Sequence, residues 1–342
     1  MAVSPRSKWN ESPEAESAGE ALFTAADCWT GDPTDPGDDA PTPPEIVANL
    51  SEQDRRRRML KLEEQAHRII DAALETHLDG HELVGTCVLF SGGNDSTVLA
   101  HLVRSRCTHA VHCNTGIGVE ATRQFVRKVC DDWALPLLER HPPKGCTYRE
   151  LCLDQGFPGP GHHFKMYQRL KQRALEQVQR ELVSQPRRER LLFVAGRRRT
   201  ESRRRAGTAP KADRTAGGQI FVPLHERKGS AIWASPIALW TKLDLVAYRG
   251  LHPDVPFNPV TDHLGMSGEC LCGCYAQEGE LERIRFWYPD VAAEIEALQV
   301  EVAAAGWGEP RCRWGHRSGG PPPARTGMLC TSCQFDDDGT LW

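Results

Sequence analysis

From residue 51 onward, short apolar runs alternate with longer stretches in which apolar residues recur at helical spacing. Short apolar runs are typical of strands buried in a parallel sheet, and a recurrence every three to four residues is typical of a helix packed on one face. Four consecutive arginines, Arg55–Arg58, are expected to form a solvated face of the first helix. The alternation predicts an α/β fold with a doubly wound, Rossmann-like parallel sheet. The predicted strands cover residues 83–90, 110–113, 135–138, 191–195 and 231–237, and the predicted helices cover 51–79, 97–103, 119–133, 163–183, 242–249 and 278–304.

Composition divides the chain into three parts. Residues 1–50 hold ten acidic side chains against Arg6 and Lys8, although the formal net charge of the whole chain is only -4. This segment has too few apolar residues to offset its ordering entropy, which predicts a disordered acidic tail. The remainder is mildly basic, which suits a phosphate-bearing ligand. It is predicted to comprise an α/β nucleotide-binding domain over residues 51–255 and a Cys-rich C-terminal region with one helix over residues 256–342.

The sequence contains neither an apolar run behind a basic start nor an apolar stretch near eighteen residues long. We therefore expect no signal peptide, no membrane span and a cytoplasmic location. Thirteen cysteines in a chain of this length do not indicate a secreted disulfide scaffold. Clustered cysteines in a reducing compartment more often hold a metal or take part in chemistry.

A glycine-rich turn joins the first predicted strand to a helix, and we call it the phosphate turn. Its glycines permit a tight turn in which backbone N–H groups approach an anion, and the helix N-terminus adds partial positive charge. The acid is expected to organise the turn or to hold Mg²⁺ through water, and Asp95 and Ser96 are the predicted catalytic residues. The alternative is an ordinary turn between a strand and a helix. The predicted ligand-binding residues of the turn are Ser91, Gly92, Gly93, Asn94, Asp95, Ser96 and Thr97.

With this turn, residues 83–275 resemble the PP-loop family, in particular its phosphoadenosine phosphosulfate (PAPS) reductase-like branch. The resemblance implies an adenine nucleotide alpha hydrolase-like fold that binds an adenine nucleotide, commonly ATP, and cleaves it between the α- and β-phosphates. Members of this kind include the ATP-pyrophosphatase subunit of DNA phosphorothioation and tRNA thiolation enzymes. Many members carry lysine where this chain has Asn94. Asparagine carries no charge, so the cation that neutralises the phosphates must come from elsewhere.

Two further segments resemble motifs of this family. Asn114-Thr115-Gly116 follows the second strand and is similar to an Asp-Thr-Gly motif beside the nucleotide, with Asn114 in place of the acid. Gly196–Arg203, the arginine loop, is similar to a Gly-x-Arg-x-x-Glu-Ser segment. We expect Asn114 and Gly116 to contact the nucleotide, and Arg197 and Arg203 to hold phosphate or sulfate oxygens. The alternatives are a simple strand end for the first segment and a solvated basic loop for the second.

The cysteines of the C-terminal region have metal-ligand spacing. A four-thiolate set of Cys274, Cys312, Cys330 and Cys333 is predicted to hold an iron–sulfur cluster or Zn²⁺. The family resemblance favours the cluster over zinc. Cys270 or Cys272 are alternative ligands in place of Cys274, and a cysteine left over could carry sulfur as a thiolate. The remaining alternative is that these cysteines are buried or free without a metal.

These features together predict an enzyme that uses ATP and Mg²⁺ to adenylate an acceptor for sulfur transfer. The acceptor is a nucleic acid or a small molecule, and a sulfur-donor protein is expected as a partner. A sulfonucleotide reductase is the first alternative, but the string Glu269–Cys274 lacks the following His of such enzymes and lies inside the chain. The second alternative is a non-catalytic nucleotide-binding module, which the neutral Asn94 would suit.

Overall fold

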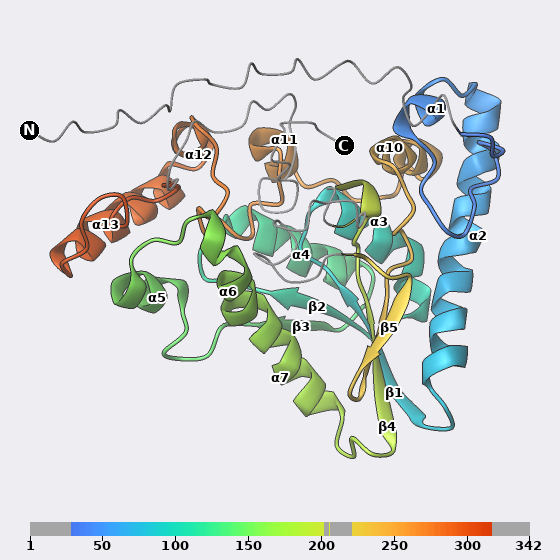
Figure 1. Cartoon of the computed structure of the whole chain (residues 1–342), viewed down its shortest axis with the longest axis horizontal. Helices are drawn as coiled ribbons and strands as arrows, with labels where there is room; N and C mark the ends of the chain where they lie inside the picture. The colour runs from blue at the N-terminus through green and yellow to red at the C-terminus, as the bar shows by residue number, and fades with distance from the viewer. Residues whose placement is uncertain (1–28, 202–204, 206–220, 317–342) are drawn as a thin grey trace, which may run out of the picture.

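The computed structural model describes residues 29–201, 205 and 221–316. Its centre is a six-stranded sheet with the strand order β3-β2-β1-β4-β6-β5. The strands run parallel except for β5, which pairs antiparallel with β6 at one edge (Figure 1). The predicted doubly wound α/β fold is therefore confirmed, although the sequence pattern missed β5. The strands are β1 Glu82–Leu89, β2 His109–Cys113, β3 Leu137–Arg140, β4 Glu189–Val194, β5 His225–Lys228 and β6 Ala231–Ala234.

Helices pack on both faces of this sheet. Side chains of a strand alternate between its two faces, and in β4 Leu192 and Val194 join a core with α2, α3, α4 and α10. Leu191 and Phe193 point the other way and pack with α7. The described α-helices are α1 Pro44–Ala48, α2 Glu52–His77, α3 Asn94–Val103, α4 Glu120–Asp132, α5 Tyr148–Gln155, α6 His163–Tyr167, α7 Arg173–Leu182, α10 Lys242–Leu251, α11 Val260–Leu264, α12 Glu280–Trp287 and α13 Pro289–Ala304.

A second apolar core lies beside the sheet, between α5 and the C-terminal helices. It unites Leu151 of α5, Leu264 of α11, Ile284 of α12 and Ile295 of α13 in one cluster of buried side chains. Figure 1 shows α5, α12 and α13 gathered on the same side of the molecule. Because this cluster also includes the buried Cys272, the Cys-rich segment is anchored within the fold.

Two predicted helices differ from the observed ones. The predicted helix over residues 278–304 is wrong, because the chain breaks between α12 and α13 at Tyr288, whose φ is -141°. Pro289 follows, and a proline disfavours helical geometry in the residue before it. The predicted helix over residues 163–183 is present as α6 and α7, joined by the π-helical turn Gln168–Gln172.

The predicted solvated face at Arg55–Arg58 is wrong for Arg58. The Arg58 side chain is fully buried, and its Nε and Nη2 donate to the carboxylate of Asp244 at 2.8 and 3.1 Å. Its Nη1 donates to Thr42 and to the carbonyl of Pro33. These contacts join Pro33 and Thr42 to α2, and Arg55 donates to the carbonyl of Ala48 in α1. Residues 29–50 therefore differ from the tail predicted over residues 1–50. Within the described part of the chain, no helix is long and apolar enough to cross a membrane.

Candidate functional site

The phosphate turn lies at the carboxyl end of β1, where ligands bind in open α/β sheets. Gly92 has a φ of +74°, and a Cβ atom added there would lie 2.8 Å from Thr122. Only glycine fits this conformation and this space. Asn258, which the sequence pattern did not single out, donates its amide to the Gly92 carbonyl at 2.9 Å and to Thr122 Oγ1 at 3.2 Å. The tight turn is thus fixed from the outside by α4 and by the segment before α11.

The hydroxyl groups of the turn are used internally. Ser96 Oγ accepts from the backbone N–H of Ser91 at 3.2 Å and donates to the Gly93 carbonyl at 3.0 Å. Thr97 Oγ1 donates to the same carbonyl at 2.8 Å. Gly93, the N-cap of α3, provides no side-chain cap for the first N–H groups of the helix. A helix N-terminus of this kind, with a fixed shape and N–H groups without a side-chain cap, favours an anion such as phosphate.

The arginine loop reaches the turn through Arg198, which the sequence analysis passed over in favour of its neighbours. Arg198 Nε donates to Asp95 Oδ2 at 2.7 Å, and its side chain is only 2% exposed. Gly196 packs against the start of α3, where a Cβ atom would lie at ordinary contact distance, 3.4 Å, from Ser96 Cα. Arg197, one of the two predicted arginines, donates its Nε–H to Ser235 Oγ at 3.2 Å. The other predicted arginine, Arg203, lies outside the described residues.

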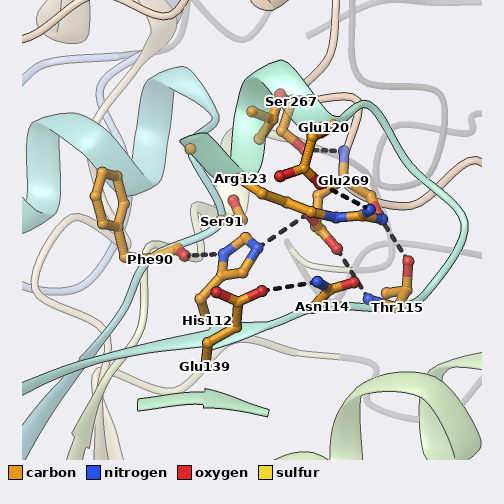
Figure 2. A network of polar contacts seen from close by, with 12 residues as sticks. Phe90, Ser91, His112, Asn114, Thr115, Glu120, Arg123, Glu139, Ser267 and Glu269 are labelled. Atoms are coloured by element: carbon orange, nitrogen blue, oxygen red, sulfur yellow. Dashed lines mark hydrogen bonds and ion pairs between the residues drawn. The ribbon is translucent and has the colours of Figure 1, made fainter. Parts of the chain in front are cut away.

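A buried network joins the end of β2 to the cysteine segment, Glu269–Cys274 (Figure 2). His112 Nδ1 donates to the Phe90 carbonyl at 2.8 Å, and His112 Nε2 lies 3.0 Å from Glu269 Oε2. Glu269 Oε1 accepts the N–H of Thr115 at 2.9 Å. Burial alone would lower the pKa of His112, but the hydrogen bond and charge of Glu269 outweigh burial and raise it. Glu269 therefore favours the charged form of His112, and the side chains of both partners are at most 2% exposed.

Asn114 and Gly116, the two predicted nucleotide contacts of this loop, lie together. The Asn114 amide donates to Glu139 Oε1 at 2.7 Å, and its carbonyl oxygen accepts the N–H of Gly116 at 3.1 Å. Hydrogen bonding by Arg127 is the main reason that the pKa of Glu139 is lowered, to about 2. Glu139 is therefore charged at neutral pH and keeps the Asn114 amide oriented. Asn114 thus has an acidic partner on the neighbouring strand β3.

The cysteine segment runs along this loop at van der Waals distance. A Cβ atom at Gly118 would lie 2.5 Å from the Glu269 carbonyl, and Leu271 donates its N–H to Ile117. Contact with the Cys272 thiol, together with burial, raises the pKa of Cys270 well above its ordinary value. The Cys270 thiol is therefore protonated at neutral pH unless a metal or a cation acts on it.

The predicted metal ligands are only partly described. Cys274 is buried and Cys312 is half-buried in the same apolar cluster, whereas Cys330 and Cys333 lie outside the described residues. Within residues 29–201, 205 and 221–316, no group of three or more His, Cys, Asp or Glu side chains is arranged to hold a metal ion. The four-thiolate site thus stays a prediction.

Comparisons with known proteins give one family match. The model of the phosphoadenosine phosphosulfate reductase domain matches residues 85–267. No curated protein matches the chain.

Several solved structures are similar in fold. PAPS reductase from Candida auris is 17% identical over 63% of this chain and 92% of its own, with a TM-score of 0.37. NMN synthetase from Francisella tularensis is 15% identical over 71% of this chain and 94% of its own, with a TM-score of 0.38. The U34-tRNA thiolase NcsA from Methanococcus maripaludis, solved with its [4Fe-4S] cluster, is 12% identical over 76% of this chain and 82% of its own, with a TM-score of 0.40.

Proposed function

The chain belongs to the phosphoadenosine phosphosulfate reductase domain family, and from this premise we propose that it binds ATP at Ser91–Thr97 and cleaves it to AMP and pyrophosphate to adenylate an acceptor for sulfur transfer. The observation that carries the proposal is the phosphate turn itself. Its glycine geometry is enforced by Thr122 and Asn258, and the N-terminus of α3 has no side-chain cap. Such a turn is fixed before a ligand arrives, which lowers the entropic cost of binding a pyrophosphate group.

The β- and γ-phosphates bind at the N-terminus of α3, with Mg²⁺ neutralising part of their charge. Asp95 is the residue proposed to hold Mg²⁺ through water, while its bond to Arg198 keeps the carboxylate oriented. The arginine loop is the proposed source of positive charge for the phosphates, with Arg198 beside Asp95 and with Arg197 and Arg203 as the residues predicted from the sequence. The loop that contains Asn114 and Gly116 is proposed to border the nucleotide from the neighbouring strand β2.

The proposed reaction has two displacement steps. In the first step, an acceptor oxygen forms a bond to the α-phosphorus, and the bond from that phosphorus to the bridging oxygen of the β-phosphate breaks. Pyrophosphate leaves with the electron pair, and the helix N-terminus and nearby cations stabilise it. In the second step, the terminal sulfur of a persulfide on the sulfur-donor protein forms a bond to the activated acceptor atom, and AMP leaves with the acceptor oxygen. A second thiol of the donor then attacks the inner sulfur and forms a disulfide with it, so that the S–S bond to the transferred sulfur breaks and the acceptor keeps that sulfur as a thiolate.

The cysteine segment is proposed to serve the sulfur side of this reaction. Cys274 and Cys312, with Cys330 and Cys333, would hold an iron–sulfur cluster or Zn²⁺, which would fix the C-terminal region and lower the pKa of nearby thiols. Cys270 directly follows Glu269, whose carboxylate binds the Thr115 N–H. This connection keeps the start of the segment beside the proposed nucleotide loop, where a sulfur carrier would be useful.

Product analysis tests the proposal. Anaerobically purified protein is incubated with ATP, Mg²⁺ and candidate acceptors, both nucleic acid and small molecules. Formation of AMP and pyrophosphate in equal amounts, lost in Gly92→Ala, is the expected result. Gly37→Ala is the matched control, because an added Cβ atom there meets no atom within 4 Å. Release of sulfite from PAPS with thioredoxin would instead indicate a reductase, and nucleotide binding without any turnover would indicate a binding module.

A further inference from the structure

Asn94 is the first residue of α3 and carries no charge, yet a cation lies beside it. Arg249, near the end of α10, has its Nη2 atom 3.4 Å from Asn94 Oδ1. Its Nη1 atom donates to the carbonyl of Pro256 at 3.0 Å, which orients the guanidinium. Helix α10 packs against α3. The packing of these two helices therefore holds Arg249 beside Asn94.

Two other cations surround the same end of α3. Arg198 is bonded to Asp95, so the charge of this acid is already offset. Burial is the main reason that the pKa of Lys242, the first residue of α10, is lowered. The nearby charge of Arg198 lowers this pKa further, whereas the charge of Asp95 raises it. Burial also lowers the pKa of Arg249, and the charges of Asp95 and Asp262 oppose this effect. Arg198, Lys242 and Arg249 thus lie around this end of α3, with Asp95 and Asp262 as acidic neighbours.

We propose that Arg249, supported by Lys242, is a phosphate-binding residue that replaces the lysine missing at Asn94. This inference rests on the proposed function, because the phosphates are those of the nucleotide at the phosphate turn. A guanidinium has five N–H groups in a planar fork, and the contacts of Arg249 with described residues occupy only Nη1 and Nη2. The contact with Asn94 is long, so a phosphate oxygen can take its place at small cost.

The position of Arg249 explains how neutral Asn94 is tolerated. A lysine at position 94 would reach the phosphates from within the turn, whereas Arg249 reaches the same place from α10. The inference therefore predicts that a lysine at position 94 is redundant in this chain but sufficient when Arg249 is lost.

Calorimetry with magnesium pyrophosphate and with ATP tests the inference on the full chain. Arg249→Gln should weaken the binding of both ligands by about 10-fold to 100-fold at low salt, and should flatten the salt dependence of affinity. Adding Asn94→Lys to Arg249→Gln should restore affinity to within about threefold of the parent. The reason is that one charged hydrogen bond to the phosphates, from the lysine, then replaces the one lost with Arg249. Arg187→Gln is the matched control, because this exposed arginine precedes β4 at the opposite end of the sheet.

Unchanged affinity in Arg249→Gln would overturn the inference. Weakened affinity that Asn94→Lys fails to restore, with a lowered free energy of unfolding, would also overturn it and make Arg249 a structural clamp on Pro256. Parent protein that binds pyrophosphate but forms no AMP would contradict the proposed ATP cleavage, while the affinities of the variants would still decide the role of Arg249. Parent protein that binds neither ligand would refute both proposals.

Discussion

The buried pair of His112 and Glu269 gives the most detailed prediction, since it connects the cysteine segment to the loop after β2. Glu269 accepts from the Thr115 N–H with one oxygen and faces His112 Nε2 with the other. Glu269→Gln keeps the geometry of both bonds. Its amide oxygen can accept from Thr115, and its amide nitrogen can donate to Nε2 of a neutral His112 whose Nδ1 still donates to Phe90. Glu269→Ala removes both bonds.

The burial of the pair sets the size of these effects. In Glu269→Ala the Thr115 N–H and His112 Nε2 both lose a partner in a region at most 2% exposed, and breaking a buried pair in this way costs about 3–5 kcal/mol of unfolding free energy. In Glu269→Gln only the charge is lost, which costs about 1 kcal/mol. Glu294→Gln on the exposed side of α13 is the control, with an effect within about 0.5 kcal/mol.

The contribution of the charge interaction between His112 and Glu269 to the unfolding free energy is predicted to depend on pH. Because the pKa of His112 is raised in the folded state, its ion pair contributes fully below the unfolded pKa of about 6.5 and is lost as pH rises through the folded pKa. The difference in unfolding free energy between the parent and Glu269→Gln should therefore be larger at about pH 6 than at about pH 8.5. Denaturant unfolding at both pH values measures it. Equal destabilisation by Gln and Ala, or a difference that grows with pH, would refute the assigned pair.

Three further predictions concern the turn and the metal. Gly92→Ala should lower the unfolding free energy by about 1–3 kcal/mol, because it adds a left-handed residue and a clash, and should abolish ATP binding by calorimetry; retained affinity would contradict the turn. Asp95→Ala should reduce ATP turnover more than ATP binding and should cost about 1–3 kcal/mol by leaving Arg198 without its partner; a parental rate at saturating Mg²⁺ would remove this role. Cys330→Ser with Cys333→Ser should eliminate bound metal, and visible absorption near about 400 nm in the parent would identify iron. Elemental analysis and limited proteolysis check the last prediction, and a metal content equal to the parent's would contradict it.

Much of the fold could be predicted because it depends on local pattern. The apolar runs before the turn and at residues 191–195 indicated β1 and β4, and the Gly-rich turn indicated the helix α3, which begins at Asn94 and not at residue 97 as predicted. The edge strand β5, with the sequence His-Glu-Arg-Lys, has no apolar pattern and was missed. Such a strand is held by its pairing with β6, which only the folded sheet provides.

Sequence reasoning could place the candidate site only where its residues lie in one segment. The phosphate turn was found, but its outer support comes from Asn258, which is 166 residues from Gly92. Likewise Arg198 bonds to Asp95 across 103 residues, and Glu269 bonds to Thr115 across 154. Residue type and spacing carry no information about such pairs, since any of several arginines in the loop could have reached Asp95. The string around Glu269 was noticed for its cysteines, whereas its carboxylate is the group that binds the loop.

The cleavage position in ATP tests the central claim most directly. ATP labelled at the α-phosphate is incubated anaerobically with the full chain, Mg²⁺ and candidate acceptors, and the products are separated. The proposal predicts labelled AMP, or a labelled adenylated acceptor, together with an equal amount of pyrophosphate, and no product with Gly92→Ala. Labelled ADP with inorganic phosphate, or AMP formation that persists in Gly92→Ala, would contradict it.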